Sequence, residues 1–328
     1  MLSELTYTLI MADITSNCNL RCPFCCNDWR SIRGNVNMSQ ETFSKLIELI
    51  PLAQNEGFLF SCLFEPTIHP DFIPFLRQIP ALGREKVFFT TNLAKRLPPE
   101  TFHELSQSNI HHINVSLDSL DPAIYEDLRR GAKFDTFMLN LENLVSVFRK
   151  YPKAPRIRFI TMAFRQNLNE LVDVVSVCHD RFLAEQHEVR APFNISLSNM
   201  DEEWIRKSII SNTEWDELES VFSKLPSYAK LLKPSALDEP KDHQSLNPFA
   251  DPRIPDIYSV TPKLSIRISS DGTTFLPWNK KKYYIHNINE IENPYMFFKK
   301  KLYRIYDVAT WTRWAYAFRI YLRTQGAP

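Results

Sequence analysis

The chain has 328 residues, which is enough for one large domain or two modest ones with a sizeable buried core. Hydrophobic residues make up 44% and charged residues 23%, and 39 basic side chains nearly cancel 38 acidic ones, so no overall charge favours nucleic acid as a partner. Residues 1–20 lack the basic start of a signal peptide and no apolar run approaches the ~20 residues of a membrane span, so we expect a cytoplasmic protein without a transmembrane segment.

In chain order, the spacing of apolar residues predicts strands that alternate with helices. The predicted strands are residues 7–14, 57–64, 86–92, 111–118, 156–164 and 187–198. The predicted helices are residues 40–50, 71–79, 99–108, a helix beginning at 122, 134–150 and 168–183. Ser39, Asp121 and Asn167 stand where helix N-caps are expected. This alternation predicts parallel βα units in a partial (β/α)6 barrel, with its site at the carboxyl ends of the strands.

The rest of the chain carries weaker signals. Residues 199–262 are expected to form a connector that contains a helix at 212–225, with Asn212 or Thr213 as its cap, and a proline-rich loop at 233–256. Residues 263–278 predict a β-hairpin with its turn at Asp271-Gly272. Residues 310–325 predict an aromatic amphipathic helix that packs against the barrel; a dimer contact, a substrate lid and membrane-surface binding are the alternatives. The expected domains are therefore residues 1–198, 199–262 and 263–328.

Residues 18–26, CNLRCPFCC, contain four of the six cysteines in the chain. A disulfide is disfavoured because the adjacent Cys25 and Cys26 bridge only with strain, and a reducing compartment opposes structural bridges. A thioredoxin-like dithiol at Cys22 and Cys25 would leave Cys18 without a role. Structural zinc usually takes two separated pairs of ligands, and the sequence has no second CxxC or HxxxH.

An iron–sulfur cluster fits the cysteines better than these alternatives. The spacing Cys18-x3-Cys22-x2-Cys25 places three thiolates on one tight loop. They can hold three corners of a [4Fe–4S] cube and leave one iron without a protein ligand. An open coordination position usually marks chemistry rather than structure. Cys26 is then expected to be a small apolar filler.

This CxxxCxxC spacing after a first strand, with Phe24 before the last cysteine, resembles the radical S-adenosylmethionine (SAM) superfamily. The resemblance covers residues 10–198 and implies a TIM-like partial barrel. It also implies one [4Fe–4S] cluster on Cys18, Cys22 and Cys25, SAM bound at the open iron with Phe24 close by, and a reductant such as flavodoxin or ferredoxin. In that superfamily a 5′-deoxyadenosyl radical abstracts a hydrogen from the substrate.

Two further segments resemble SAM-binding motifs of the superfamily. Residues 62–72 stand in the place of a Gly-Gly-Glu-Pro segment whose backbone meets the SAM amino group. Glu65 and Pro66 match this motif, whereas Leu63 and Phe64 replace both glycines, so the close approach that glycine allows is lost. Asn92 ends a Thr-Thr-Asn segment that resembles the Thr-Asn-Gly end of the third strand.

The segment VSLDSLDPAIYEDLRRGAKFD, residues 115–135, gives the longest match to the superfamily. The resemblance implies that Ser116 and Asp118 lie near the ribose hydroxyls of SAM, and that Arg129 pairs with the SAM carboxylate. The chemistry fits, because short polar side chains bond to vicinal hydroxyls and a guanidinium binds a carboxylate with two parallel hydrogen bonds.

The hairpin at residues 263–278 resembles the C-terminal extension called SPASM or twitch, whose cysteines hold auxiliary iron–sulfur clusters. Here Pro277 and Trp278 stand at the cysteine position, and no cysteine follows Cys178. We therefore expect a degenerate, small α+β extension without an auxiliary cluster.

The resemblance predicts an enzyme, and a non-catalytic metal-binding barrel is the alternative of another class. Because auxiliary clusters often serve electron removal, their absence favours a redox-neutral reaction on a small molecule, such as a sugar, aminocyclitol, nucleoside or natural-product intermediate. A peptide substrate is the alternative, although a first strand near residue 7 leaves no space ahead of it for a leader-peptide domain. Epimerisation would need a hydrogen donor; Cys62 is the first candidate, and Cys26 and Cys178 are others.

Overall fold

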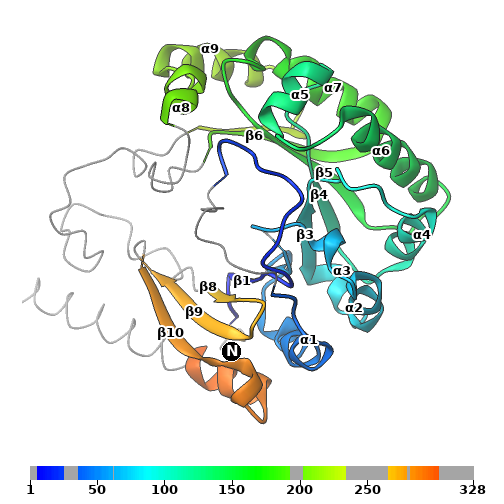
Figure 1. The fold of residues 1–328 in the computed structure, drawn as a ribbon, viewed down its shortest axis with the longest axis vertical. Helices are drawn as coiled ribbons and strands as arrows, with labels where there is room; N and C mark the ends of the chain where they lie inside the picture. The colour runs from blue at the N-terminus through cyan, green and yellow to red at the C-terminus, as the bar shows by residue number, and fades with distance from the viewer. Residues whose placement is uncertain are drawn as a thin grey trace, which may run out of the picture.

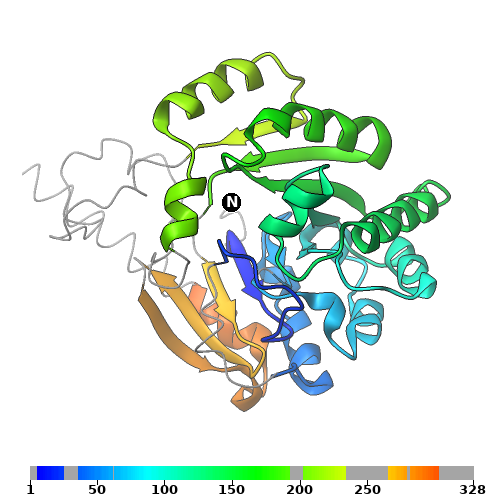
Figure 2. The same ribbon diagram turned by 45° about the horizontal axis from the view of Figure 1, so that its top comes forward.

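The computed structural model describes residues 6–25, 36–61, 63–192, 202–233, 265–278 and 281–302. These residues form one curved, ten-stranded sheet with helices along its outer face (Figure 1). Turned by 45°, the same ribbon shows the curvature of the sheet, with the C-terminal strands beside the N-terminal one (Figure 2). No helix in the described ranges is both long and apolar enough to cross a bilayer.

The first seven strands pair in chain order, and every pair is parallel. They are β1 (Leu9–Ala12), β2 (Phe58–Leu59), β3 (Val87–Thr91), β4 (His112–Ser116), β5 (Arg156–Met162), β6 (Ala184–Arg190) and β7 (Ala229–Leu232). The α-helices are α1 (Gln40–Ile47), α2 (Phe72–Gln78), α3 (Gly83–Lys86), α4 (Pro99–Gln107), α5 (Pro122–Leu128), α6 (Phe134–Phe148), α7 (Leu171–Phe182), α8 (Glu202–Ser208), α9 (Asn212–Phe222) and a helix at residues 294–302. The 3-10 turns are η1 (Ile50–Leu52), η2 (Pro66–Ile68), η3 (Leu168–Glu170) and η6 (Ile288–Glu290). The predicted parallel α/β architecture is confirmed.

Alternating side chains divide each central strand between a helix-covered face and an inner face. On β4, Ile113 and Val115 are at most 1% exposed and belong to the main apolar core under the helices. Because successive side chains of a strand point to opposite faces, His112, Asn114 and Ser116 share the inner face. The sequence therefore builds the core with one set of residues and leaves the other set for the interior of the barrel.

The C-terminal strands extend this sheet at its β1 edge. They are β8 (Ser265–Ile268), β9 (Thr273–Trp278) and β10 (Lys281–Asn287). β8 pairs in parallel with β1, whereas β9 and β10 add antiparallel strands. The predicted turn at Asp271-Gly272 is present, and the φ of +83° at Gly272 is a conformation that glycine adopts without strain. The predicted C-terminal strand extension is thus confirmed, and the division into three domains stays a prediction.

An ion pair ties β8 to the end of β1. Arg267 Nη2 lies 2.7 Å from Asp13 Oδ2, and Asp13 Oδ1 accepts a hydrogen bond from the Leu63 N–H at 3.0 Å. Asp13 is the residue directly after β1, and its chain leads into the cysteine loop. The C-terminal strands therefore help to position the segments that follow β1 and β2.

The sequence located most elements, and the structure corrects the prediction in several places. The sixth strand, expected at 187–198, begins at Ala184, because Leu183 adopts a left-handed conformation (φ +58°) that ends α7 and turns the chain directly into the sheet. Strands β7 and β10 and the short helices α3 and α8 were not predicted at all. The predicted C-terminal helix at 310–325 lies outside the described residues.

The predicted helix caps are partly confirmed. Ser39 accepts a hydrogen bond from the Thr42 N–H at 3.0 Å, and Asp121 accepts two bonds at the start of α5. The cap of α9 is Ser211, not Asn212 or Thr213, because Ser211 has extended backbone and forms a reciprocal capping box with Glu214. Asn167 is not a side-chain cap either: its amide donates to the carbonyls of Asp118 and Met162 and so joins the ends of two strands.

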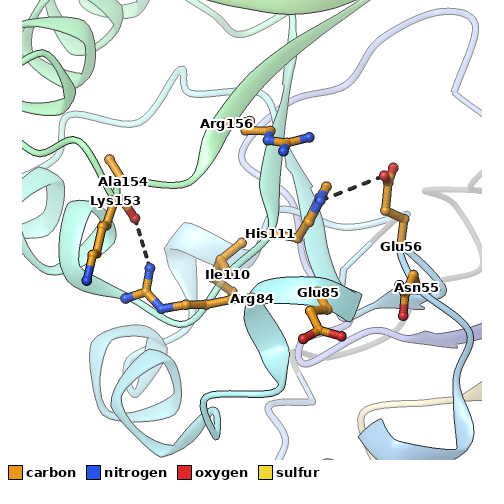
Figure 3. A pocket seen from close by; sticks show the side chains of 9 residues that line it. All are labelled: Asn55, Glu56, Arg84, Glu85, Ile110, His111, Lys153, Ala154 and Arg156. Atoms are coloured by element: carbon orange, nitrogen blue, oxygen red, sulfur yellow. Dashed lines mark hydrogen bonds and ion pairs between the residues drawn. The ribbon is translucent and has the colours of Figure 1, made fainter.

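A pocket of about 340 Å³ lies at the amino ends of the strands, the end opposite the cysteine loop. Figure 3 shows Glu56 facing His111 there, with Arg156 nearby. Glu56, His111 and His112 place ligand-type atoms within 4.8 Å of one another. However, Arg158 binds Glu56 at 2.6 Å, and burial together with the charge of Arg158 lowers the pKa of His112 to about 2. The surrounding guanidinium groups repel a cation, so the charged residues at this end of the barrel form ion pairs with one another and do not suit a metal site.

Candidate active site

A cavity of about 270 Å³ opens at the carboxyl ends of the strands, below the cysteine loop. Most of the site residues predicted from the sequence line this cavity, although they lie far apart along the chain. The predicted residues that line it are Cys18, Cys22, Phe24, Cys25, Glu65, Asn92, Ser116 and Arg129. Asp118 does not line the cavity and is fully buried behind it.

The cysteine loop is fixed by backbone bonds to the segment after α5. The Arg21 N–H donates to the Arg130 carbonyl at 2.8 Å, and within the loop the Cys25 N–H donates to the Cys22 carbonyl at 3.1 Å. Gly131 has φ +96°, and a Cβ there would lie 3.4 Å from the Asn19 carbonyl oxygen. The space would accept a Cβ, so it is the positive φ, which residues with a side chain rarely adopt, that explains the glycine in the motif.

The three thiols of this loop suit a metal cluster. None is disulfide-bonded, all three are partly exposed, and all line one cavity. Burial raises the pKa of Cys18 to about 12 and that of Cys22 to about 11, so without a metal these groups are neutral thiols. The Cys18 sulfur accepts from the Leu20 N–H and the Asn92 amide, each at 3.5 Å. Three sulfur ligands on one loop fit a [4Fe–4S] cluster with one open iron, and they fit four-coordinate structural zinc poorly.

The remaining cysteines are placed less favourably for chemistry or fall outside the described residues. Cys178 is fully buried on α7 within the main apolar core and does not line the cavity. The structure therefore places Cys178 in the core, away from the cavity where a hydrogen donor would be needed. Cys26 and Cys62 lie outside the described residues, so the predicted hydrogen donor Cys62 stays a prediction.

Phe24 anchors the loop on its other side. Its ring lies 4.8 Å from that of Phe164 and 6.1 Å from that of Trp204, and the Arg129 guanidinium lies 5.4 Å from its centroid. These contacts belong to a small apolar cluster that joins the loop to α5 and α8. The aromatic residue before the last cysteine thus holds the loop in place and covers one face of Arg129.

Asp118 and Arg129 form a buried ion pair in which Arg129 lines the cavity and Asp118 lies behind it. Arg129 Nε donates to Asp118 Oδ2 at 2.6 Å, and Asp118 Oδ1 accepts from the Met162 N–H at 2.8 Å. Burial alone would lower the pKa of Arg129, but the Asp118 carboxylate beside it raises that pKa overall. Both Asp118 oxygens are therefore occupied, whereas the terminal nitrogens of Arg129 have no hydrogen-bond partner among the described residues and remain able to bind an anion.

Glu65 ties the loop after β2 to the end of β3. Its Oε1 accepts from the Thr67 N–H, the Thr67 hydroxyl and the Thr91 hydroxyl, and its Oε2 accepts from the Asn92 N–H at 2.6 Å. The Glu65 N–H in turn donates to the Asn17 carbonyl at 3.1 Å, next to the cysteine loop. The carboxylate is only 2% exposed, so it organises the surrounding backbone.

Replacing Glu65 by glutamine is expected to lower the free energy of unfolding by about 1–3 kcal/mol, because an amide group cannot accept all of these bonds. Burial raises the pKa of Glu65 above 4.5. The part of the stability that depends on protonation of Glu65 is therefore fully present below pH 4.5 and is lost as pH rises through the raised pKa. Denaturant unfolding at several pH values measures both effects. Glu104→Gln, in an exposed pair with Arg77, is the control and should cost under about 1 kcal/mol; equal stability of the two variants at pH 5 would contradict the role of Glu65.

Three polar residues of the cavity were not predicted as site residues: Thr90, Asn114 and Arg190. Arg190 lies at the end of β6, opposite Met162 on β5, and forms an ion pair with Glu188. Strand alternation could have located Asn114, because it is two residues before Ser116 on the same strand. Arg190 was not recognised as a strand-end residue because the sixth strand was predicted to continue past it.

Comparison with known proteins gives one family and several distant relatives. A family model described as the Radical SAM superfamily matches residues 13–178, just over half of the chain. GTP 3′,8-cyclase of Haemophilus influenzae is 31% identical over 147 residues, 43% of this chain and 42% of that protein. Molybdenum cofactor biosynthesis protein 1 of Homo sapiens is 26% identical over 235 residues, 69% of this chain and 35% of that protein. The chain thus spans less than half the length of either relative.

Solved structures share the fold at low sequence identity. Streptococcus suis SuiB bound to S-adenosylmethionine aligns with a TM-score of 0.60 and 16% identity, covering 91% of this chain and 67% of that one. SuiB bound to its precursor peptide SuiA aligns with a TM-score of 0.58 and 16% identity, covering 90% of this chain and 67% of that one. At this identity the likeness extends to the arrangement of the sheet and helices.

Proposed function

The chain belongs to the radical SAM superfamily, and we propose that it is an enzyme whose Cys18, Cys22 and Cys25 hold one [4Fe–4S] cluster beside bound SAM. Members of this superfamily use such a cluster together with SAM, and SuiB, which shares the fold, has been solved with SAM bound. The observation that carries the proposal is the convergence of three cysteines and Arg129 on one cavity at the carboxyl ends of the strands. When bound, the cluster supplies the electron that cleaves SAM and so generates the 5′-deoxyadenosyl radical, which removes a hydrogen from the substrate.

The residues around the cysteines have separable tasks in this proposal. Arg129, held by Asp118, would bind the SAM carboxylate with its terminal nitrogens. Ser116 lines the cavity at the end of β4, where its hydroxyl can bond to the SAM ribose. Asp118 acts through Arg129 and the Met162 N–H, because neither of its oxygens faces the cavity. Glu65 and Asn92 would hold the backbone that faces the SAM amino group.

For the reaction, we propose hydrogen abstraction from a small molecule with a redox-neutral outcome. The sequence supports one cluster, because no cysteine follows Cys178 and the C-terminal strands have none to offer a second cluster. The cavity also has apolar lining residues that would keep water from a radical: Leu63, Phe64, Met162 and Pro192. A peptide is the alternative substrate, and turnover with a peptide would decide for it. A reductant such as flavodoxin or ferredoxin would supply the electron.

Iron content and SAM cleavage test this proposal together. Protein that is purified and reconstituted without oxygen is expected to bind about four irons and four sulfides per chain. With SAM and dithionite it is expected to form 5′-deoxyadenosine. About eight irons per chain would contradict the prediction of a single cluster. Bound zinc without SAM cleavage would favour the non-catalytic metal-binding barrel instead.

A further inference from the structure

We propose that Thr90 and Asn114 determine substrate specificity by donating and accepting hydrogen bonds with a hydroxylated ring, such as that of a sugar, a cyclitol or a ribose. This inference rests on the proposed function, because it places the substrate next to the SAM site in the same cavity. It also narrows that function, since it selects small hydroxylated molecules over peptides.

The position of the two residues is the first argument. Thr90 on β3 and Asn114 on β4 are register partners on neighbouring strands, and both line the cavity. Asn114 precedes Ser116 by two residues on the inner face of β4, which places it about 7 Å deeper along the strand. A molecule that reaches Thr90 and Asn114 would therefore lie below the ribose of SAM, toward the interior of the barrel.

The missing hydrogen bonds of these side chains are the second argument. Asn114 is only 9% exposed, yet its amide has no hydrogen-bond partner among the described residues, and neither has the Thr90 hydroxyl. The other buried asparagines in the described chain are bonded: Asn92 to Asn19, Asn140 to two carbonyls and Asn167 to two carbonyls. Buried polar side chains in native proteins are nearly always paired. Asn114 is a buried exception, and the partly exposed Thr90 hydroxyl beside it adds a second group without a partner in the same cavity wall, so we infer that a ligand supplies both partners.

The rest of the wall completes a site for a polar ring with an apolar face. Leu59, Phe88 and Ile160 line the cavity beside Thr90 and Asn114. The Phe88 ring is held by stacking on His112, with centroids 4.5 Å apart and the planes inclined by 16°. The C–H face of a sugar or cyclitol can pack on such a ring while its hydroxyl groups reach the two polar side chains.

The test uses the reconstituted holoenzyme with SAM and three probes: D-glucose, myo-inositol and uridine. Binding to the unreduced enzyme is measured by calorimetry. Turnover is followed with deuterated probes and dithionite, as deuterium that appears in 5′-deoxyadenosine. We expect at least one probe to bind and to donate deuterium. Thr90→Val and Asn114→Leu, which remove the polar atoms with little change of size, should each weaken that binding about tenfold or more.

Two control variants separate recognition from structure. Thr90→Ser keeps the hydroxyl and should bind the probe within about threefold of the wild type, whereas Asn55→Leu, at the opposite end of the barrel, should leave binding unchanged. The inference is overturned if SAM is cleaved but no probe donates deuterium, if only a deuterated peptide does, or if Thr90→Val and Asn114→Leu bind like the wild type. Failure of the wild type to cleave SAM at all would instead refute the proposed function, and the calorimetry would still report on Thr90 and Asn114.

Discussion

Cys22→Ala is expected to abolish cluster binding and 5′-deoxyadenosine formation, and Cys18→Ala and Cys25→Ala should do the same. A cube-shaped cluster held at three corners keeps no stable position when one of its three protein ligands is removed. We expect bound iron to fall from about four per chain to below about one, and SAM cleavage to fall at least about a thousandfold. Iron analysis, the visible absorption of the cluster and product analysis measure the three effects.

Cys178→Ala is the matched control for this experiment. It removes a thiol of the same chemistry from the apolar core on α7, away from the cavity. It should cost some stability because it leaves a small void, while iron content and SAM cleavage stay at the wild-type level. If a variant of Cys18, Cys22 or Cys25 retained about four irons and active SAM cleavage, the ligand assignment would be wrong. Loss of iron from Cys178→Ala at a temperature where that variant remains folded would also contradict the ligand assignment.

The sequence located the cluster loop because that signal is local. Cys18, Cys22 and Cys25 lie within eight positions of one another, so their spacing alone limits the kinds of metal group that they can bind together. The alternation of apolar residues in HINVS likewise placed β4 on the correct residues, since strand periodicity depends only on near neighbours. What could be predicted was therefore the order of the elements and the place of the three-cysteine loop at the carboxyl ends of the strands.

Pairing between distant segments could not be predicted in the same way. Residues 263–278 were expected to form a hairpin, but its partner strand was not predicted: β8 pairs in parallel with β1, more than 250 positions away. Strand β7 carries only the four residues Ala229–Leu232, with alternating partial exposure, so its local pattern is too short to distinguish it from a loop. Its place is set by pairing with β6, which no local pattern reports.

The roles of polar residues at strand ends also depend on geometry that a motif does not contain. Ser116 and Asp118 were expected to act alike on the SAM ribose, but Ser116 lines the cavity and Asp118 is buried behind it. Asp118 turns away because the Met162 N–H and Arg129 offer it two strong donors. Conversely, Asn114 carried no motif and yet has the buried, unpartnered amide that indicates a ligand.

Arg129→Leu is expected to weaken SAM binding at least about thirtyfold, because truncating one partner of a buried charge pair or charge-assisted contact costs about 2–5 kcal/mol. It should also lower the free energy of unfolding by about 3–5 kcal/mol, since Asp118 would remain as a buried charge without its partner. Calorimetry with SAM on the reconstituted protein measures the first effect, and denaturant unfolding measures the second.

The double variant Asp118→Asn/Arg129→Leu separates these two effects. Asparagine removes the uncompensated charge and keeps an oxygen for the Met162 N–H, so most of the lost stability should return. SAM binding should stay weak, because no guanidinium faces the SAM carboxylate in either variant. Arg129→Lys should bind SAM with an affinity between those of the wild type and Arg129→Leu. An ammonium group keeps the charge but cannot bond to Asp118 and a second carboxylate in the same fixed geometry. If the double variant bound SAM as tightly as the wild type, Arg129 would serve only to neutralise Asp118, and the SAM carboxylate would have to bind elsewhere in the cavity.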